Sequence, residues 1–222
     1  MPPEPVVEEI VRLCLGTLQA RAAMFYWVND ADMAEVSLTG LPAVFAAEYA
    51  DGLERCDPSN VRRLVATGAR VTQFSRARPE FIEDARIFGG FLSRFGALDV
   101  IDLLFRAEGD AVAGIGIIKM QGDPAAGEAQ LAQAEAIQRF VEFGLQRHER
   151  VLRWCRPRRA MRTYQLTSRE WEVAALAAEG LGNREIAERL NLSAHTVKSH
   201  LLHAFGKTGS ANRTQLAARL DV

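Results

Sequence analysis

In the first 120 residues, segments whose apolar residues recur at the three- and four-residue spacing of a helix alternate with short apolar runs typical of strands. After Pro5 they recur three and four apart, whereas later runs are β-branched and aromatic. The predicted elements, in order, are a helix from Pro5 to about Ala22, strands at 24–28 and 33–38, helices at 42–55, after Asp57-Pro58 and at 79–95, and strands at 100–106 and 111–120.

The middle of the chain carries a long amphipathic pattern, which predicts one helix over 127–154. Pro157 then interrupts it, and five basic residues crowd into 153–162 without apolar periodicity. We therefore predict a linker between two domains. The expected boundaries are a first domain at 1–154, the linker at 155–165 and a second domain at 166–222.

The order of elements predicts a different fold class for each domain. Hairpins imply antiparallel pairing, so the first domain should be α+β, an antiparallel sheet with flanking helices. The second contains only helical patterns, which predicts an all-α domain of four helices. Its helices are expected from Thr167 or Ser168 to Gly180, at 183–190, from Ala194 to about Phe205, and at about 212–220.

The third of these helices has two contrasting faces. Val197, Leu201 and Phe205 recur four apart and should pack on the second helix. A short connection at 191–193 joins the two, which is the spacing of a helix-turn-helix. The opposite face presents Lys198, Ser199, Leu202 and His203. A helix of this size fits the major groove, where such side chains can contact bases or phosphates.

Charge is divided unevenly along the chain. The whole sequence has a net charge of −1, but residues 150–222 hold 13 Lys and Arg against 6 Asp and Glu, and residues 1–149 hold 14 against 22. Binding to DNA phosphates requires cations, so the split favours a nucleic-acid-binding second domain. The chain lacks a basic leader and any run of 18 apolar residues, and we expect a cytoplasmic protein without a membrane anchor.

The last 55 or so residues contain a set of spaced residues that together match one known family. They are Leu166, Thr167, Arg169, Glu170, Glu172, Val173, Gly180, Asn183, Glu185, Ile186, Ala187, Leu190, Ser193, Thr196, Val197, Lys198, His200, Lys207, Asn212, Arg213 and Thr214. Through these residues the segment resembles the LuxR-type DNA-binding domain, also called the GerE or FixJ C-terminal domain. The resemblance implies a four-helix module that forms homodimers on two-fold-related promoter sites and could contact RNA polymerase. The residues expected at the DNA are Thr196, Lys198, Ser199, Leu202, His203, Asn183 and Arg213. Thr208 and Ser210 stand where the family usually has aliphatic residues.

The first domain is expected to sense a signal. A phosphoryl-accepting receiver would need a parallel sheet, which the predicted hairpins argue against. Leu41-Pro42-x-x-Phe45-x-x-x-Tyr49 followed by Asp57-Pro58 partly resembles the autoinducer-binding domain of quorum-sensing LuxR-type regulators, with Phe45 in place of the lactone-binding Trp. The rest of the domain resembles GAF or PAS sensor folds. The candidate ligand-binding residues are Phe25, Trp27, Phe45, Tyr49 and Asp57.

Three alternatives to a small-molecule sensor remain open at this point. The aromatic residues could simply form a core, and Asp57 could cap a helix. The domain could be ligand-free and bind a protein partner or heterodimerise. Enzyme activity is not expected, because the first domain has no phosphate-binding glycine loop, no histidine apart from His148 and no metal-ligand spacing. No cofactor and no metal are predicted.

Overall fold

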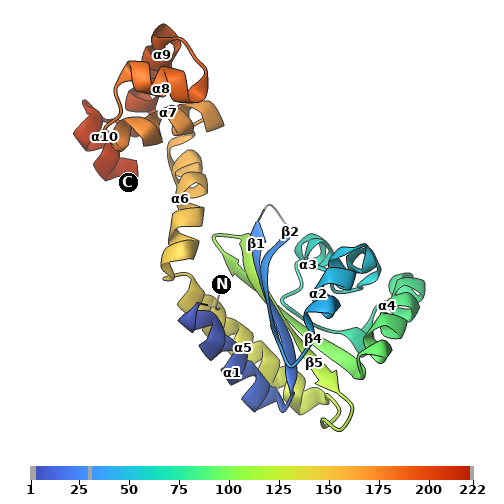
Figure 1. Ribbon diagram of the computed structural model, residues 1–222. Helices are drawn as coiled ribbons and strands as arrows, with labels where there is room; N and C mark the ends of the chain where they lie inside the picture. The colour runs from blue at the N-terminus through green and yellow to red at the C-terminus, as the bar shows by residue number, and fades with distance from the viewer. Residues whose placement is uncertain (1–3, 30–31, 221–222) are drawn as a thin grey trace. The chain divides into compact units, whose positions relative to one another are not determined.

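The computed structural model describes residues 4–29 and 32–220 of the chain, so the predicted domain ends at 1 and 222 lie outside the described residues (Figure 1). It divides into two compact units, with the division between Arg147 and His148. Each unit is described by itself below.

The first unit contains a five-stranded antiparallel sheet with the strand order β2-β1-β5-β4-β3. The strands are β1 (Ala22–Asn29), β2 (Asp32–Thr39), β3 (Val71–Gln73), β4 (Ala97–Ala107) and β5 (Asp110–Met120). β4 and β5 are buried along most of their length because helices cover both faces, which explains their nearly continuous apolar sequences. The α+β prediction is confirmed.

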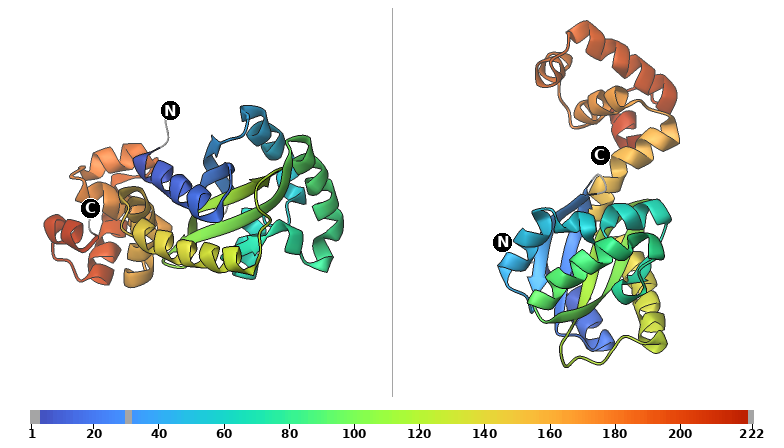
Figure 2. Two further views of the ribbon diagram at one scale, coloured as in Figure 1. Left: turned by 90° about the horizontal axis from the view of Figure 1, so that it is seen from below. Right: turned by 90° about the vertical axis from the view of Figure 1, so that its right-hand side faces the viewer.

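Helices lie on both faces of this sheet. α1 (Pro5–Leu18) and α5 (Glu128–Leu145) lie side by side on one face, and α2 (Ala43–Ala50), α3 (Val61–Thr67) and α4 (Ile82–Arg94) lie on the other (Figures 1 and 2). The α2–α4 side encloses an aromatic and aliphatic core that includes Phe45, Tyr49, Phe88 and Phe91. This layer contains the candidate ligand site.

Short elements between the helices depart from the predicted pattern. The helix expected over 42–55 ends at Ala50, because Gly52 adopts a left-handed φ of 114°, and a 3-10 turn, η1 (Leu53–Cys56), follows. Two further 3-10 turns, η2 (Phe74–Arg76) and η3 (Pro79–Phe81), precede α4. β3 was not predicted, since three residues are too few to establish an alternating pattern.

The second unit is all helical. α7 (Ser168–Ala178), α8 (Asn183–Leu190), α9 (Ala194–Thr208) and α10 (Arg213–Leu220) form the predicted four-helix module, preceded by α6 (Glu149–Tyr164). Their apolar faces share one core, and its fully buried members include Val173, Ile186, Val197, Ala204 and Leu216. The all-α prediction is confirmed.

The predicted single helix over 127–154 is corrected by the structure, and most of the segment predicted as the linker, 155–165, lies within α6. α5 ends at Leu145, and α6 begins after His148, whose backbone is extended. Pro157 lies inside α6 and removes one backbone hydrogen bond, but the Arg, Trp, Met and Ala residues around it favour helix strongly enough to continue through it. The apolar spacing runs across the break, so periodicity alone does not reveal it.

Candidate functional sites

The outward face of α9 is the candidate DNA interface. Val197, Leu201 and Ala204 are buried in the core, which leaves Lys198, Leu202 and His203 exposed on the opposite face. Leu202 is 59% exposed, an unusual position for a large apolar side chain unless it meets a partner. Ser199 is half-buried, and its hydroxyl donates to the carbonyl of His195 at 3.3 Å.

The N-terminus of α9 is fixed by a side-chain cap. The Ser193 hydroxyl accepts from the backbone N–H of Thr196 at 3.0 Å and lies 2.8 Å from the Thr196 hydroxyl. This cap satisfies one of the unpaired N–H groups in the first helical turn. Thr196, half-buried, is therefore held close to the point where α9 would approach the DNA backbone.

Two of the predicted DNA-contacting residues are paired with each other. The guanidinium of Arg213, at the start of α10, donates to the Asn183 side chain and to the carbonyl of Leu181. These contacts tie α10 to the N-terminus of α8. The structure therefore gives Arg213 and Asn183 a role in holding the helices of the domain together.

A partly buried ion pair connects α7 to α9. Lys207 Nζ lies 2.6 Å from Glu170 Oε2 and donates to the Gln165 carbonyl at 2.9 Å. Glu170 also accepts from the backbone N–H of Thr167 at 2.8 Å, completing a capping box. Burial alone would raise the pKa of Glu170, but the hydrogen bonds from Lys207 and Thr167 hold it below its ordinary value.

In the first unit, the structure brings Phe45, Tyr49 and Asp57 together under the sheet. The Tyr49 hydroxyl donates to Asp57 Oδ2 at 2.8 Å, and both residues are buried. Phe45 packs on Phe91 of α4, with ring centroids 4.7 Å apart. The aromatic side chains form one wall of the site, and the carboxylate lies at its polar end.

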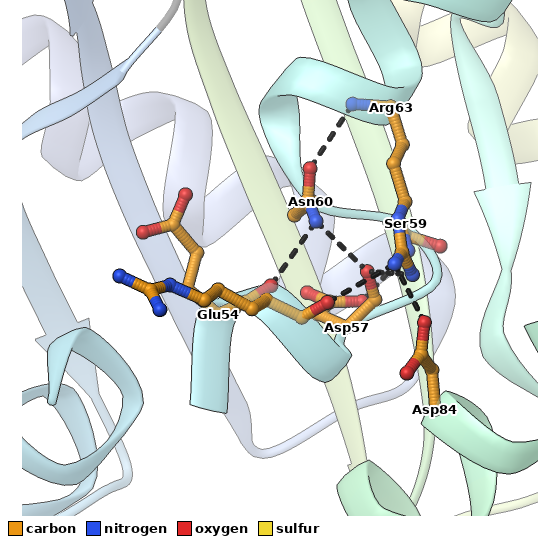
Figure 3. A network of polar contacts seen from close by, with 7 residues as sticks. Glu54, Asp57, Ser59, Asn60, Arg63 and Asp84 are labelled. Carbon is orange, nitrogen blue, oxygen red and sulfur yellow. Dashed lines mark hydrogen bonds and ion pairs between the residues drawn. The ribbon is translucent and has the colours of Figure 1, made fainter. Parts of the chain in front are cut away.

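Asp57 is held by the turn between η1 and α3 (Figure 3). Its Oδ1 accepts from the Ser59 N–H at 2.7 Å, and Asn60 Nδ2 donates to the carbonyls of Glu54 and Asp57, both at 3.1 Å. Asn60 rather than Asp57 is the N-cap of α3, since its Oδ1 accepts from the Arg63 N–H. The Asp57 carboxylate therefore does not cap α3, which was one of the roles that the sequence left open.

The guanidinium of Arg63 does not pair with the Asp57 carboxylate. It donates to the backbone carbonyls of Asp57 and Arg55, each at 3.1 Å, and to the Asp84 carboxylate at 2.6 Å (Figure 3). Its hydrogen bonds thus brace the turn against α4. The carboxylate itself faces the interior with Tyr49 and the Ser59 N–H as partners.

Phe25 and Trp27 do not join this cluster. Met24, Tyr26 and Val28 of β1 belong to the α2–α4 core, so the alternation along the strand turns Phe25 and Trp27 to the other face. There the two rings meet edge to face, with centroids 5.4 Å apart. The structure therefore does not bring the five candidate ligand residues into one site.

Two residues that the sequence analysis did not name lie on the side of the sheet that faces α2–α4, where Phe25 and Trp27 had been expected. They are Tyr26 on β1 and Asp102 on β4. A Cβ on Gly114 would come within 2.4 Å of the Tyr26 hydroxyl, and one on Gly116 within 3.0 Å of Asp102 Oδ1. Both side chains thus lie over β5 where that strand has only glycine. The sequence did contain a sign of this site, because Asp102 is a charged residue within the apolar run of β4. In the sheet it pairs with Gly116, which leaves room for its side chain.

The two aspartates form a buried acidic pair. Burial raises the pKa of Asp57 to about 6, although hydrogen bonds from Ser59 and Tyr49 lower it in part. Burial and then the charge of Asp57 raise the pKa of Asp102 well above its ordinary value. Desolvation and repulsion both disfavour two ionised carboxylates here. The site therefore favours either protonation of a carboxyl or a nearby positive charge over two ionised carboxylates.

Two kinds of site are absent from the described residues. They contain no group of three or more His, Cys, Asp or Glu side chains arranged to hold a metal ion. In the same ranges, 4–29 and 32–220, no helix combines the length and apolar character needed to cross a membrane.

Comparisons with known proteins give this arrangement a context. Residues 164–220 match the family described as bacterial regulatory proteins, luxR family. The monoamine regulon transcriptional regulator of Klebsiella aerogenes is 27% identical over 221 residues, covering 96% of this chain and 90% of that protein. A putative HTH-type transcriptional regulator of Mycobacterium bovis is 49% identical over 51 residues, which cover 23% of this chain and only 6% of that protein.

The fold also matches a solved structure. SdiA in complex with octanoyl-rac-glycerol has a TM-score of 0.51 and 18% identity, covering 99% of this chain and 89% of that chain. Residues 164–220 therefore form a luxR-family helix-turn-helix domain, as the sequence predicted. The chain that carries this domain is a DNA-binding transcriptional regulator.

Proposed function

We propose that the protein is a cytoplasmic regulator that acts by binding rather than by catalysis. In this proposal a homodimer binds two-fold-related promoter DNA, and a small molecule held between the sheet and α2–α4 controls that binding. The exposed face of α9 carries the DNA-binding part, because its core-facing residues are buried and its polar face is open.

The proposed roles on α9 follow from chemistry and exposure. Lys198 donates to a guanine edge or a phosphate, and Leu202 contacts a thymine methyl group. Thr196, Ser199 and His203 lie on or beside the same face and contact the backbone or water. Asn183 and Arg213 support this surface through their mutual hydrogen bond rather than by reading bases.

Control by a small molecule is supported by the unusual polarity of the α2–α4 core. A packed core gains nothing from two buried aspartates without a cation, so their presence favours a binding role. The names of two related proteins, one the regulator of a monoamine regulon and one crystallised with octanoyl-rac-glycerol, agree with an organic signal. A quorum-sensing-like signal falls within this class.

Homodimerisation is supported by an apolar surface on α5. Phe140 and Phe143 are 70% and 58% exposed, and Ala129, Ala132 and Ala136 continue their stripe along the helix. Exposed aromatic residues at helical spacing favour a protein interface. We expect the double substitution of Phe140 and Phe143 by Asp to convert a dimer to a monomer in light scattering, with unchanged far-UV circular dichroism. A wild-type monomer would instead favour the alternative, control by a protein partner.

The proposed control is tested by removing whatever the purified full-length protein carries. Released small molecules are identified by mass spectrometry, and the affinity for a bound promoter fragment is measured before and after their removal. We expect a released compound whose return restores the original affinity. The same affinity in every state, together with no released compound, would refute ligand control and leave DNA binding as the only supported activity.

A further inference from the structure

Tyr26 is 3% exposed, and its ring end and hydroxyl lie over Gly114 of β5. The hydroxyl is not one of the fully buried polar groups that lack a partner. A phenolic oxygen in this position can accept a hydrogen bond from a ligand. Tyr26 thus adds a polar group to the apolar core between the sheet and α2–α4.

The acidic pair beside Tyr26 has no cation of its own. Asp102 is 6% exposed, and the Ser59 hydroxyl lowers the pKa of its carboxyl in part. No Lys or Arg among the described residues forms an ion pair with Asp102, and the Arg63 guanidinium is engaged by two carbonyls and Asp84. Tyr26 and Asp102 lie over Gly114 and Gly116, which are two residues apart on β5. The turn that carries Asp57 reaches the same region, because the Ser59 hydroxyl bonds to Thr72, the cross-strand neighbour of Asp102.

A metal ion fits this site poorly. Two carboxylates and two phenols fall short of the six or more oxygen ligands that calcium prefers, and the described residues contain no metal-binding group of three. Apolar walls surround the acidic pair instead. Tyr49 meets the ring of Phe88 at 6.0 Å between centroids, and Phe91 stacks on Phe88 at 5.8 Å. Such walls suit an organic cation with an apolar body.

A cavity of about 260 Å³ approaches the acidic pair from the edge of the sheet at β3. Ser59 and Thr72 line it, and their hydroxyls are 3.1 Å apart. Arg63, Arg76 and Arg78 line the cavity as well, whereas Tyr26, Asp57 and Asp102 do not. A small molecule in this cavity would have to pass these cations and the Ser59 hydroxyl to reach the acidic pair.

We propose that Asp57 and Asp102, with the Tyr26 hydroxyl, recognise the protonated amine of a small ligand that has an aromatic or aliphatic body. The inference rests on the proposed function, because it names the chemical class of the controlling molecule. An ammonium group donates three hydrogen bonds, one each to the two carboxylates and one to the Tyr26 oxygen. It also supplies the positive charge that the acidic pair lacks.

The test compares amines with their neutral counterparts on full-length protein at pH 7.5. Thermal midpoints are measured with 2-phenylethylamine, hexylamine and ethanolamine, and with 2-phenylethanol, hexanol and ethylene glycol as matched neutral compounds. 1-Octanoylglycerol serves as a neutral lipid. We expect at least one amine to raise the midpoint with a half-saturating concentration about tenfold or more below that of its alcohol.

Two variants locate the response. Asp102→Asn should keep the fold and weaken the amine response about tenfold or more, whereas Asp51→Asn, an exposed aspartate at the end of α2, should leave it unchanged. Tyr26→Phe keeps the ring and removes only the hydroxyl, and should weaken the response by a smaller factor. A structural role for Asp102 alone would change the midpoint without changing the difference between amine and alcohol.

The outcomes separate this inference from the proposed function. If no amine exceeds its alcohol, or if Asp102→Asn retains the full amine response, the inference is wrong. Should 1-octanoylglycerol then stabilise the protein and change its affinity for DNA, ligand control would stand with a neutral ligand. If neither class binds and DNA affinity never changes, both proposals fall together.

Discussion

In the DNA-binding domain the buried carboxylate of Glu170 has Lys207 against it at 2.6 Å, whereas burial raises the pKa of Asp57 and of Asp102 in the first domain, the sensor domain of our proposal. The first arrangement satisfies a charge and connects two helices. The second disfavours two ionised carboxylates in the folded state. Buried charge thus stabilises the fold in one domain and, in our proposal, serves ligand binding in the other.

The largest change in stability is expected when the cation that pairs with Glu170 is removed, because Glu170 then resembles the unpaired aspartates of the first domain. Lys207→Met leaves Glu170 buried without its partner, and we expect a loss of about 1–3 kcal/mol in the free energy of unfolding of the second domain. Partial exposure of Lys207 limits the effect. Urea unfolding followed by circular dichroism measures it. Arg169→Met, which removes the exposed pair with Glu172 and a 3.4 Å hydrogen bond to the Leu190 carbonyl, is the matched control.

Removing a charge from the sensor domain should have the opposite sign. Asp102→Asn eliminates the repulsion with Asp57 and the cost of an ionised buried carboxylate. We expect its thermal midpoint at pH 8, without ligand, to exceed that of the wild type by roughly 2–4 °C. A lower midpoint at pH 8 would show that Asp102 stabilises the folded state as a carboxylate.

The pH dependence of stability distinguishes the two domains further. The folded pKa values of Asp57 and Asp102 lie above the unfolded value of about 3.9, so the folded state binds their protons more tightly. Stability of the sensor domain therefore falls as pH rises from about 4 through 6, the folded pKa of Asp57. The pKa of Glu170 is lowered, and its contribution is present above its unfolded pKa and is lost as pH falls through its folded value.

Other groups act on the same titration. The charged and titratable groups that influence the acidic pair are Glu54, Arg63, Asp99, Tyr26 and Tyr49. Thermal midpoints of wild type and Asp102→Asn from pH 5 to 8 measure the combined effect. We expect the two curves to diverge as pH rises, and parallel curves would contradict the unpaired-carboxylate account.

The smallest effect is expected at a polar pair in the second domain that needs no charge. The Thr208 hydroxyl donates to the Ala204 carbonyl at 2.7 Å and lies 2.9 Å from the Ser210 hydroxyl, so both groups are satisfied where the family usually has aliphatic residues. Replacing both by Val and Ala removes donors and acceptors together. We expect a change below about 1 kcal/mol in the free energy of unfolding, whereas Thr208→Val alone should cost more, because it leaves Ser210 unpaired.

The sequence predicted the DNA-binding domain more completely than the ligand site, and the reason is locality. The Thr167 and Ser193 caps and the spacing from Val197 to Leu201 are contained within single helices, so α7–α10 could be recognised without tertiary information. The pairing of Arg213 with Asn183 joins residues 30 positions apart, and the pattern gave no sign of it.

The sensor site depends on which face of each strand meets which helix. Phe45, Tyr49 and Asp57 were predicted because they share one short segment of chain. The alternation of side chains along β1 predicts that Phe25 and Trp27 share one face of the strand. It does not predict which face meets α2–α4, and in the structure that face carries Tyr26. Asp102 comes near the turn that carries Asp57 only in the folded chain, where the Ser59 hydroxyl of that turn bonds to Thr72 on β3 beside Asp102, and no local pattern records this contact.

The central claim is that α9 of a dimeric regulator reads DNA through Lys198, and selection from a random duplex library tests it most directly. The full-length wild type, Lys198→Ala and Arg12→Ala, an exposed arginine on α1, are each used to select bound sequences, and affinities are then measured on the wild-type motif. The account predicts a two-fold-related motif for the wild type and for Arg12→Ala. For Lys198→Ala it predicts binding weakened by about 1–3 kcal/mol, with relaxed preference at one position per half-site. An unchanged motif and affinity in Lys198→Ala, or no enriched motif with the wild type, would contradict it.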